Sequence, residues 1–475
     1  MMARNNQTLW DLIVIGAGPG GYSAAIRAAQ LGWRVVCIDQ RLTPGGTCLH
    51  AGCIPSKALL DDSHKYVEAI HTLTSHHLLS PVAPLQPDLT LLMARKQRVI
   101  NKLADGITAL FKKQGVTMVC GRAEVRQPGL VAVHHDDSGE NGTLLQAPRI
   151  LLAMGSVAVT LPQLPYDGDR IVDAAAALSW TSIPRRLVVV GAGAIGLELG
   201  SLWARLGSQV TLVESQPDIL LGMEALVVRQ ALRLWQQQVT LLVHHAVVST
   251  TVRENEVELS VQDGRTGTVR QLAADRVLVA VGRCPNREAV SSLPLAYSAA
   301  GRMVVDEHFE TSIPGLFAIG DLIDGPMLAH KATDDGIACV EQWLEGREPR
   351  CSSRVIPHVV YTDPELVAMG MTTQQAQSQG IAVRSGSCLL AANGRAQAAD
   401  RAVGVVRVIA AAADDRLLGV HACGPQASEM MAMALPALQH GWSSRQLGEL
   451  VVPHPSLAEA LKEAALLACH RAIHG

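Results

Sequence analysis

Two cysteines stand close together in the sequence, in the segment GGTCLHAGCIPSK at residues 45–57. Cys48 and Cys53 are five positions apart, so their sulfurs can meet across about one distorted helical turn and close a small reducible ring. The glycines before Cys48 allow the backbone to approach a cofactor, and Gly52 and Pro55 disturb the helix that would otherwise hold the sulfurs apart. The segment therefore predicts a two-electron dithiol–disulfide couple. The alternative interpretation is a pair of ordinary buried thiols.

A candidate for acid–base chemistry lies near the end of the chain, in HPSLAE at residues 454–459. A thiol has to lose its proton before it attacks a disulfide, so His454 is a natural base. Glu459 could orient the ring by accepting a hydrogen bond from its other nitrogen. Ser456 and Glu459 also fit a capping box that opens the last helix, so a structural role for Glu459 is equally compatible with the pattern. A lone histidine before a helix is likewise more often structural than catalytic.

An internal repeat indicates which elements could position a cofactor beside these residues. Residues 12–39, LIVIGAGPGGYSAAIRAAQLGWRVVCID, match residues 187–214, LVVVGAGAIGLELGSLWARLGSQVTLVE, at a constant offset of 175. Each copy reads as a short buried strand, a glycine turn, a helix ended by glycine and a second strand closed by an acid. The turn glycines are Gly16, Gly18 and Gly21 in the first copy and Gly191, Gly193 and Gly196 in the second, and the closing acids are Asp39 and Glu214.

This βαβ pattern carries a specific physical meaning. The first glycine permits a tight turn, the second lets the backbone approach a pyrophosphate, and the third lets the helix pack close to the strand. The start of the helix offers unpaired N–H groups to the phosphate, and the acid accepts hydrogen bonds from the adenosine ribose. One copy alone could be a ligand-free turn, but two full copies predict two bound dinucleotides.

The remaining sequence predicts further elements. Residues 277–281 and 315–321 read as strands, and the second ends in Asp321. From about residue 350, apolar and polar residues alternate, and a helical Ala- and Met-rich stretch follows, which indicates a third, α+β domain. The predicted fold class is α/β, with two Rossmann-like dinucleotide-binding domains and a C-terminal α+β domain.

Composition argues against several other classes. The net charge is −3 and no basic run reaches five residues, so neither nucleic acid nor an anionic membrane is an expected partner. No apolar run reaches the ~20 residues that span a bilayer, and the polar start lacks a secretory signal, so we expect a cytoplasmic protein. Eight of the ten cysteines are scattered singly and read mostly as small buried residues. The histidine pairs at 76–77 and 244–245 read as loop or solvated-face residues, and no metal is expected.

These motifs together resemble the pyridine nucleotide–disulfide oxidoreductase family, and within it most closely the dihydrolipoyl dehydrogenases. The resemblance runs from about residue 10 to residue 465. The segments that carry it are GAGPGG at 16–21, GGTCLHAGCIPSK at 45–57, GAGAIGLE at 191–198, GRCPN at 282–286, AIGD at 318–321, PMLAHKA at 326–332, VIPHVVYTDPE at 355–365 and HPSLAEA at 454–460.

The resemblance implies a role for each candidate residue. The first copy of the repeat would bind FAD and the second NAD. Cys48 would exchange with dihydrolipoamide, Cys53 would face the flavin, and His454, supported by Glu459, would be the acid–base. Lys57 and Glu198 would pair near the reactive edge of the flavin. Asp321 would hold the ribityl chain, and the flavin ring would be flanked by Met327, Leu328, Ala329 and His330. The other cofactor-binding residues would be Gly46, Thr47, Gly121, Gly155, Val247 and Gly282.

The resemblance also implies the domain organisation and the partners. Residues 1–155 would be the first part of an FAD-binding domain with the redox disulfide, and 156–275 would bind NAD. Residues 276–348 would complete the FAD-binding and central part, and 349–475 would form a dimerisation domain. In the implied homodimer each histidine serves the partner's disulfide. The other expected partner is a lipoyl-bearing carrier protein of a 2-oxo acid, acetoin or glycine-cleavage complex.

Four positions depart from the family pattern. Asp39 stands where glutamate is common and Met154 where threonine is usual, which puts individual FAD contacts in question. Val452-Pro453 stands where lipoamide enzymes often show His-Ala, which weakens the assignment to that branch.

The alternative function is another FAD-dependent disulfide or metal-ion reductase of the same family. Mercuric reductases carry a vicinal cysteine pair at the tail, whereas this tail reads LACH at 467–470. Glutathione reductase-like members use NADPH, against which Glu214 argues, and thiol peroxidase or NADH oxidase relatives would have one redox cysteine. An assembly subunit without catalysis is disfavoured by the intact cysteine pair. The resemblance thus implies a flavoenzyme that oxidises protein-bound dihydrolipoamide with NAD.

Overall fold

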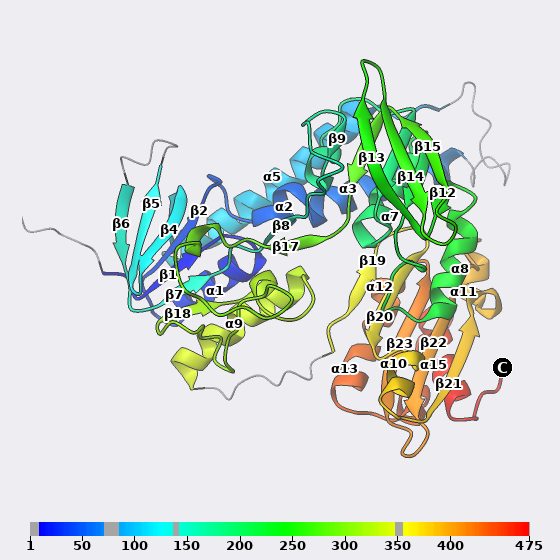
Figure 1. Ribbon diagram of the computed structural model, residues 1–475. Helices are drawn as coiled ribbons and strands as arrows, with labels where there is room; N and C mark the ends of the chain where they lie inside the picture. The colour runs from blue at the N-terminus through cyan, green and yellow to red at the C-terminus, as the bar shows by residue number, and fades with distance from the viewer. Residues whose placement is uncertain (1–8, 71–84, 136–141, 347–354, 475) are drawn as a thin grey trace, which may run out of the picture. The chain divides into compact units, whose positions relative to one another are not determined.

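The computed structural model describes residues 9–70, 85–135, 142–346 and 355–474, and the chain divides into two compact units (Figure 1). Unit 1 comprises Met1–Ala58, Thr90–Val159 and Gly282–Cys351, and unit 2 comprises Leu59–Leu89, Thr160–Val281 and Ser352–Gly475. The predicted α/β class, with two Rossmann-like regions and a C-terminal domain, is confirmed. The four-part division at residues 155, 275 and 348 stays a prediction, and its last boundary lies outside the described residues, as do His76 and His77.

Unit 1 is built on a five-stranded parallel sheet. Its central strands are rich in Val, Ile and Leu and are buried except at Asp39, as expected for a sheet covered on both faces. Helices α1 (Pro19–Gln30) and α9 (Ala329–Glu345) pack against each other. Across the sheet the order is β18 (Leu316–Ala318), β7 (Ile150–Leu152), β1 (Leu12–Ile15), β2 (Val35–Asp39) and β3 (Thr117–Cys120).

Smaller elements complete unit 1. Helix α3 begins in unit 1 and continues into unit 2 beyond Ala58. Helix α5 begins at Leu89, the last residue of that segment of unit 2, and continues in unit 1. The helices are α2 (Gly46–Ala51), α3 (Cys53–Ile70) and α5 (Leu89–Gln114), with 3-10 turns η1 (Glu288–Val290) and η2 (Gly320–Leu322). An antiparallel sheet contains β4 (Arg122–Gln127), β5 (Leu130–His134) and β6 (Gly142–Gln146), and a second pair joins β8 (Ser156–Ala158) to β17 (Arg283–Pro285).

The first part of unit 2 contains the second parallel sheet. Its strand order is β12 (Val239–Leu242), β11 (Gln209–Val213), β10 (Arg186–Val190), β16 (Arg276–Val279) and β9 (Ile171–Val172). The helices are α6 (Ala174–Ala177), α7 (Ala194–Arg205) and α8 (Ala225–Trp235). An antiparallel sheet of β13 (His245–Val252), β14 (Val257–Asp263) and β15 (Val269–Ala274) contributes buried residues to the same core.

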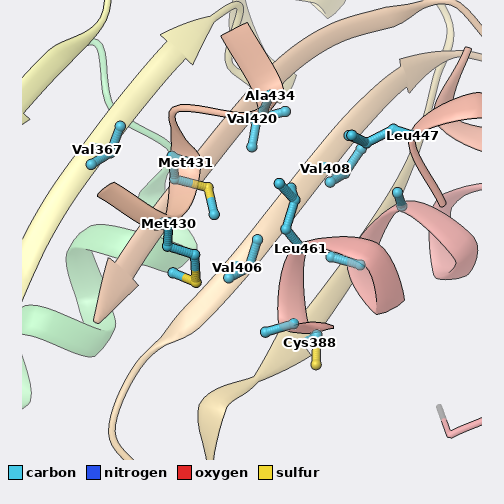
Figure 2. Packing of buried hydrophobic residues seen from close by; sticks show 14 of the residues in the cluster. Val367, Cys388, Val406, Val408, Val420, Met430, Met431, Ala434, Leu447 and Leu461 are labelled. Carbon is cyan, nitrogen blue, oxygen red and sulfur yellow. The ribbon is translucent and has the colours of Figure 1, made fainter. Parts of the chain in front are cut away.

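The C-terminal part of unit 2 is an antiparallel sheet with helices. Its alternating apolar residues form one core with the last helix, and Figure 2 shows Leu461 pointing toward Val406 and Val408. Burying a side chain such as Leu461 contributes roughly 1.5–3 kcal/mol. The strand order is β19 (His358–Val360), β20 (Glu365–Gly370), β23 (Leu417–Gly424), β22 (Val405–Ala411) and β21 (Val383–Leu389). The helices are α10 (Thr373–Ser378), α11 (Gly394–Ala398), α12 (Ala427–Met431), α13 (Ala434–Gln439), α14 (Ser444–Gly448) and α15 (Ala458–Ala468), with a 3-10 turn η3 (Leu390–Ala392).

Candidate active site

The first and third glycines of each repeat are required by the fold itself. Gly16 has φ +100°, and a Cβ built there would lie 2.4 Å from the carbonyl oxygen of Ala153. A Cβ on Gly21 would lie 1.8 Å from the carbonyl oxygen of Gly16, because the helix crosses the strand so closely. The second copy repeats this geometry, with φ +100° at Gly191 and a Cβ on Gly196 only 1.9 Å from Gly191.

The middle glycines have no such requirement from the protein. A Cβ on Gly193 would meet no atom within 4 Å, and one on Gly18 would meet only the Cα of Gly46, at 3.9 Å. Both are N-cap residues without a side-chain cap, at the starts of α7 and α1, where the first backbone N–H groups lack helical partners. The space and the free donors fit the pyrophosphate of a dinucleotide at both turns.

The closing acids hold the two glycine turns in the same way. Asp39 accepts a hydrogen bond from the backbone N–H of Ala17 at 2.8 Å, and Glu214 accepts one from Ala192 at the same distance. The other carboxyl oxygen of each acid accepts from a backbone N–H two residues further along, at Arg41 and Gln216. Asp39 thus makes every backbone contact that the longer Glu214 makes.

A polar chain leads to Asp321 at the end of the unit 1 sheet. Ser156 donates its hydroxyl to Asp321 at 2.6 Å, and Arg283 donates Nε to the Ser156 hydroxyl at 2.7 Å. Next to Ser156, Gly155 has φ +67° and open space at its Cβ position, whereas Met154 packs on the apolar core. The sequence did not single out Ser156, which follows Gly155, or the contact of Arg283, which lies within the motif GRCPN.

The other predicted cofactor residues divide into those with an exposed or half-buried side chain or open space, and those that pack against the protein. Residues 327–329 are half-buried around the first residue of α9, and His330 is exposed. Thr47 is exposed in the first turn of α2, and Gly282 has φ +121° with open space. The structure gives three of them a packing role: Gly46, whose Cβ would lie 2.5 Å from Gly18; Gly121, whose Cβ would lie 2.6 Å from Val133; and Val247, which is buried in β13. Their cofactor contacts stay predictions.

The two cysteines lie on either side of a helix break. Helix α2 ends at Ala51, and α3 begins at Cys53. A Cβ on Gly52 would lie 2.9 Å from the carbonyl oxygen of Thr47 and 3.3 Å from the Cα of Cys48, so only glycine fits at this approach. The predicted disturbance of the helix is therefore confirmed at Gly52, whereas Pro55 lies inside α3 and does not interrupt it. Pro55 falls in the first turn of α3, where its missing N–H costs no helical hydrogen bond.

The side chains of the two cysteines contact each other through a hydrogen bond. Cys48 is partly buried and Cys53 is exposed. The side-chain hydrogen bond between Cys48 and Cys53 is the largest cause that raises the pKa of Cys48, burial adds to it, and the charge of Lys57 acts in the opposite direction. Cys53 is the first residue of an 18-residue helix, whose positive end favours a thiolate at that sulfur. The pair can therefore form and break a disulfide with one sulfur better suited to carry charge.

His454 and Glu459 are in contact at the start of the last helix. Nδ1 of His454 lies 2.8 Å from Oε1 of Glu459, and Oε2 accepts from the backbone N–H of Ser456 at 2.9 Å. The Ser456 hydroxyl donates instead to the carbonyl of Pro453, so the full capping box is not formed. The backbone N–H of Ser456, followed by His454, lowers the pKa of Glu459. The His454 side chain is 79% exposed, which leaves its second nitrogen accessible.

Glu198 is buried within α7 in unit 2. It is 5% exposed, and its Oε1 accepts a hydrogen bond from the backbone N–H of Tyr361 at 3.0 Å. Lys57 belongs to unit 1, so the pairing of Lys57 with Glu198 stays a prediction.

One interpretation of the histidines is wrong. His245 is buried at the start of β13, with Nδ1 at 2.7 Å from the carbonyl oxygen of Val243, and is not a loop or solvated-face residue. Among the described single cysteines, Cys37, Cys339, Cys388 and Cys423 are buried as expected, whereas Cys284 is exposed. Within residues 9–70, 85–135, 142–346 and 355–474 no group of three His, Cys, Asp or Glu could hold a metal, and no helix there is long and apolar enough to cross a membrane.

Comparisons with known proteins match this geometry. Residues 10–336 match the family model for pyridine nucleotide–disulphide oxidoreductases, and residues 356–465 match the dimerisation domain of that family. The chain belongs to the pyridine nucleotide–disulphide oxidoreductase family. A mitochondrial dihydrolipoyl dehydrogenase of Arabidopsis thaliana is 41% identical over 467 residues, 98% of this chain and 91% of that protein.

Two further proteins are similar to the chain over nearly its whole length. A leghemoglobin reductase of Glycine max is 41% identical over 459 residues, 96% of this chain and 87% of that protein. The solved structure of an HOCl-induced flavoprotein disulfide reductase from Escherichia coli has a TM-score of 0.84 at 25% identity, and covers 96% of this chain and 100% of its own.

Membership of this family confirms several predictions. The chain is an enzyme, a flavoprotein disulfide oxidoreductase, and FAD and NAD are the cofactors of the dihydrolipoyl dehydrogenases in its family. The dimerisation domain at residues 356–465 supports the predicted homodimer.

Proposed function

We propose that the chain oxidises protein-bound dihydrolipoamide to lipoamide, with NAD as the electron acceptor. The observation that carries the proposal is the contact between the Cys48 and Cys53 thiols at the start of α3, in a chain with 41% identity to a dihydrolipoyl dehydrogenase. A dithiol substrate matches such a pair because thiol–disulfide exchange transfers two electrons without another reactant.

The exchange proceeds in two displacements. One substrate thiolate attacks the sulfur of Cys48 in the Cys48–Cys53 disulfide, and the bond between the cysteines breaks to leave a thiolate on Cys53. The second substrate sulfur then attacks the mixed disulfide, which closes the lipoamide ring and releases Cys48. The substrate is thereby oxidised by two electrons and the cysteine pair is reduced by two.

The surrounding residues support these displacements. Cys48 is better suited to stay protonated after release, because its contact with Cys53 and its burial raise its pKa. Cys53 is better suited to hold the negative charge, because it lies at the positive end of α3. When bound, FAD would supply the two-electron redox chemistry that links the cysteine pair to NAD.

His454 receives the proton of the attacking substrate thiol, and the proton of the second thiol goes to Cys48 as it is released. Glu459 holds Nδ1, so Nε2 is the nitrogen that faces outward from an exposed ring. In a two-fold homodimer every contact is repeated, so a histidine that reaches the partner's cysteine pair would complete two sites at once. We propose that His454 acts in this way across the dimer interface.

NAD is the proposed nucleotide because of Glu214. Its carboxylate, fixed by Ala192 and Gln216, is placed to accept the ribose hydroxyls and to repel a 2′-phosphate. The residues that follow, SQPD at 215–218, supply no arginine to neutralise that phosphate.

The lipoyl group would be carried by a protein of a 2-oxo acid, acetoin or glycine-cleavage complex. A cytoplasmic location is part of the proposal, although the relative from Arabidopsis thaliana is mitochondrial.

Steady-state turnover of the yellow holoenzyme tests the function. We expect NADH to form with dihydrolipoamide, much faster than with glutathione as the thiol or NADP as the acceptor. The Cys48→Ser variant provides the matched inactive control. Faster turnover of leghemoglobin, mercuric ion or another disulfide than of lipoamide would favour the alternative, a different reductase of the family.

A further inference from the structure

A buried ion pair on the first turns of α9 has no part in the roles described above. The side chain of Lys331 is 8% exposed, and its Nζ lies 2.9 Å from Oδ2 of Asp335, one helical turn further along. Burial raises the pKa of Asp335, while the charge of Lys331 acts to lower it. Removing two such charges from water is costly, and apolar residues of similar size often stabilise a core equally well. Stability alone therefore gives little reason for this pair.

Both side chains of the pair hydrogen-bond the backbone of Gly320, the first residue of η2, in the loop before α9. Lys331 donates from Nζ to the carbonyl oxygen of Gly320 at 2.9 Å, and Asp335 accepts from the backbone N–H of Gly320 at 3.1 Å. Gly320 has φ +67°, a backbone conformation that glycine adopts without steric cost. The same loop returns past the lysine, since a Cβ on Gly325 would lie 3.1 Å from Cε of Lys331. The loop is thus fixed to α9 at a single backbone residue.

The residue after Gly320 is Asp321. Its carboxylate is oriented by the Ser156 hydroxyl at 2.6 Å, and its carbonyl accepts from Arg302 at 2.9 Å. The ion pair fixes the backbone on the other side of Asp321, because it hydrogen-bonds both the N–H and the carbonyl of the preceding residue, Gly320. We infer that Lys331 and Asp335 are positioning residues that set the carboxylate of Asp321 for the ribityl hydroxyls of FAD. This inference rests on the role proposed for Asp321 and on FAD as cofactor, and it is independent of the identity of the thiol substrate.

The test measures the release of FAD from the holoenzyme on dilution, followed by the fluorescence of free FAD. Asp335→Asn removes one charge, and the double variant Lys331→Met with Asp335→Leu removes both. Glu341→Gln is the matched control, because Glu341 is a buried carboxylate on the same helix that is ion-paired with Arg27 at 3.0 Å, whereas the hydrogen bonds to Gly320 come from Lys331 and Asp335. The thermal midpoint of each FAD-free protein is recorded alongside.

We call the hydrogen bonds from Lys331 and Asp335 to Gly320 the clamp, and Asp335→Asn and the double variant the clamp variants. We expect FAD to bind at least about tenfold more weakly to both, because each loses a hydrogen bond to Gly320. We expect the double variant to recover the thermal midpoint that the single one loses, yet not the affinity for FAD. Glu341→Gln should change FAD affinity by less than about twofold, because the ion pair with Arg27 that it weakens is separate from the hydrogen bonds that hold Gly320.

Three results would overturn the inference. Wild-type FAD affinity in the folded double variant would show that Gly320 needs no clamp. An equal loss of FAD from Glu341→Gln would show a general effect of charge on α9, and failure of both clamp variants to fold would place the pair in folding instead. A protein with these expected FAD affinities that does not oxidise dihydrolipoamide would contradict the proposed function alone.

Discussion

Glu459 holds Nδ1 of His454 with one carboxyl oxygen, at 2.8 Å, and the backbone N–H of Ser456 with the other, at 2.9 Å. The sequence allowed two roles for this glutamate, and the structure shows one carboxylate making both contacts. The ring is thus fixed by a group that also anchors the turn before α15. An amide in its place would have one acceptor atom for two donors.

Glu459→Gln should therefore lower kcat more than it lowers stability. We expect kcat with dihydrolipoamide to fall by about ten- to a hundredfold, within the range contributed by an acid–base group. Glu463→Gln, one turn further along α15, is the control, and its kcat should stay close to wild type. If the two variants lose activity in the same proportion as thermal stability, Glu459 is a structural residue only.

The choice of nucleotide depends on Glu214. We expect kcat/KM for NAD to exceed that for NADP by at least about a hundredfold, and Glu214→Ala to lower the NAD value by about tenfold or more, as expected for loss of charged hydrogen bonds. Glu214→Asp is the control, because Asp39 makes the same 2.8 Å contact in the first copy of the repeat. Comparable values of kcat/KM for NAD and NADP in the wild type would contradict this account.

His421 should make stability depend on pH. It is fully buried; Nδ1 lies 3.4 Å from the backbone N of Glu224, Nε2 lies 3.1 Å from the carbonyl oxygen of Met371, and Arg407 is its other charged neighbour. Burial lowers its pKa, while the Met371 carbonyl and Glu224 oppose that effect. The unfolded chain then binds a proton more readily than the folded one below about pH 6.5. Stability contributed by neutral His421 is therefore present above that pH and is lost as the pH falls toward the folded pKa.

The check compares thermal midpoints at neutral and mildly acidic pH. We expect the decrease on acidification to be smaller in His421→Gln than in the wild type. His440→Gln, at an exposed position, should keep the wild-type decrease. An equal decrease in wild type and His421→Gln would show that this histidine is not the group that titrates.

Mixed dimers test whether His454 serves the partner's cysteines. Cys48→Ser and His454→Gln are each expected to be inactive, and refolding them together gives heterodimers with one intact pair opposite one intact histidine. Such a heterodimer should recover about half of the wild-type activity, since one of two symmetric sites is complete. Heterodimers that form but stay as inactive as their parents would rule out action across the interface.

Local pattern was sufficient to predict the two βαβ units and the helix break between the cysteines. These features depend on residues close in the sequence, such as Gly16 against Gly21 and Gly52 against Cys48, whose steric limits are visible in the sequence. The C-terminal domain followed from alternating apolar residues in the same way.

What the sequence could not give depends on contacts between distant segments. Ser156, Arg283 and Asp321 meet only because β8, β17 and η2 are brought together by the fold. The burial of His245 depends on where β13 packs, and the clamp on Gly320 depends on the approach of η2 to α9. Residue type and spacing carry no signal for any of these.

The central claim is that electrons pass from dihydrolipoamide through Cys48 and Cys53 to the flavin and then to NAD, and an anaerobic titration tests it most directly. Dihydrolipoamide should replace the oxidised flavin spectrum with the long-wavelength absorbance of a thiolate beside the flavin, and NAD should restore it with an equivalent amount of NADH. Cys48→Ser should retain the long-wavelength band before any thiol is added, because Cys53 remains as a thiolate, whereas Cys53→Ser should lack it. Identical spectra for the two variants, or a wild-type flavin that stays oxidised with dihydrolipoamide, would contradict the account.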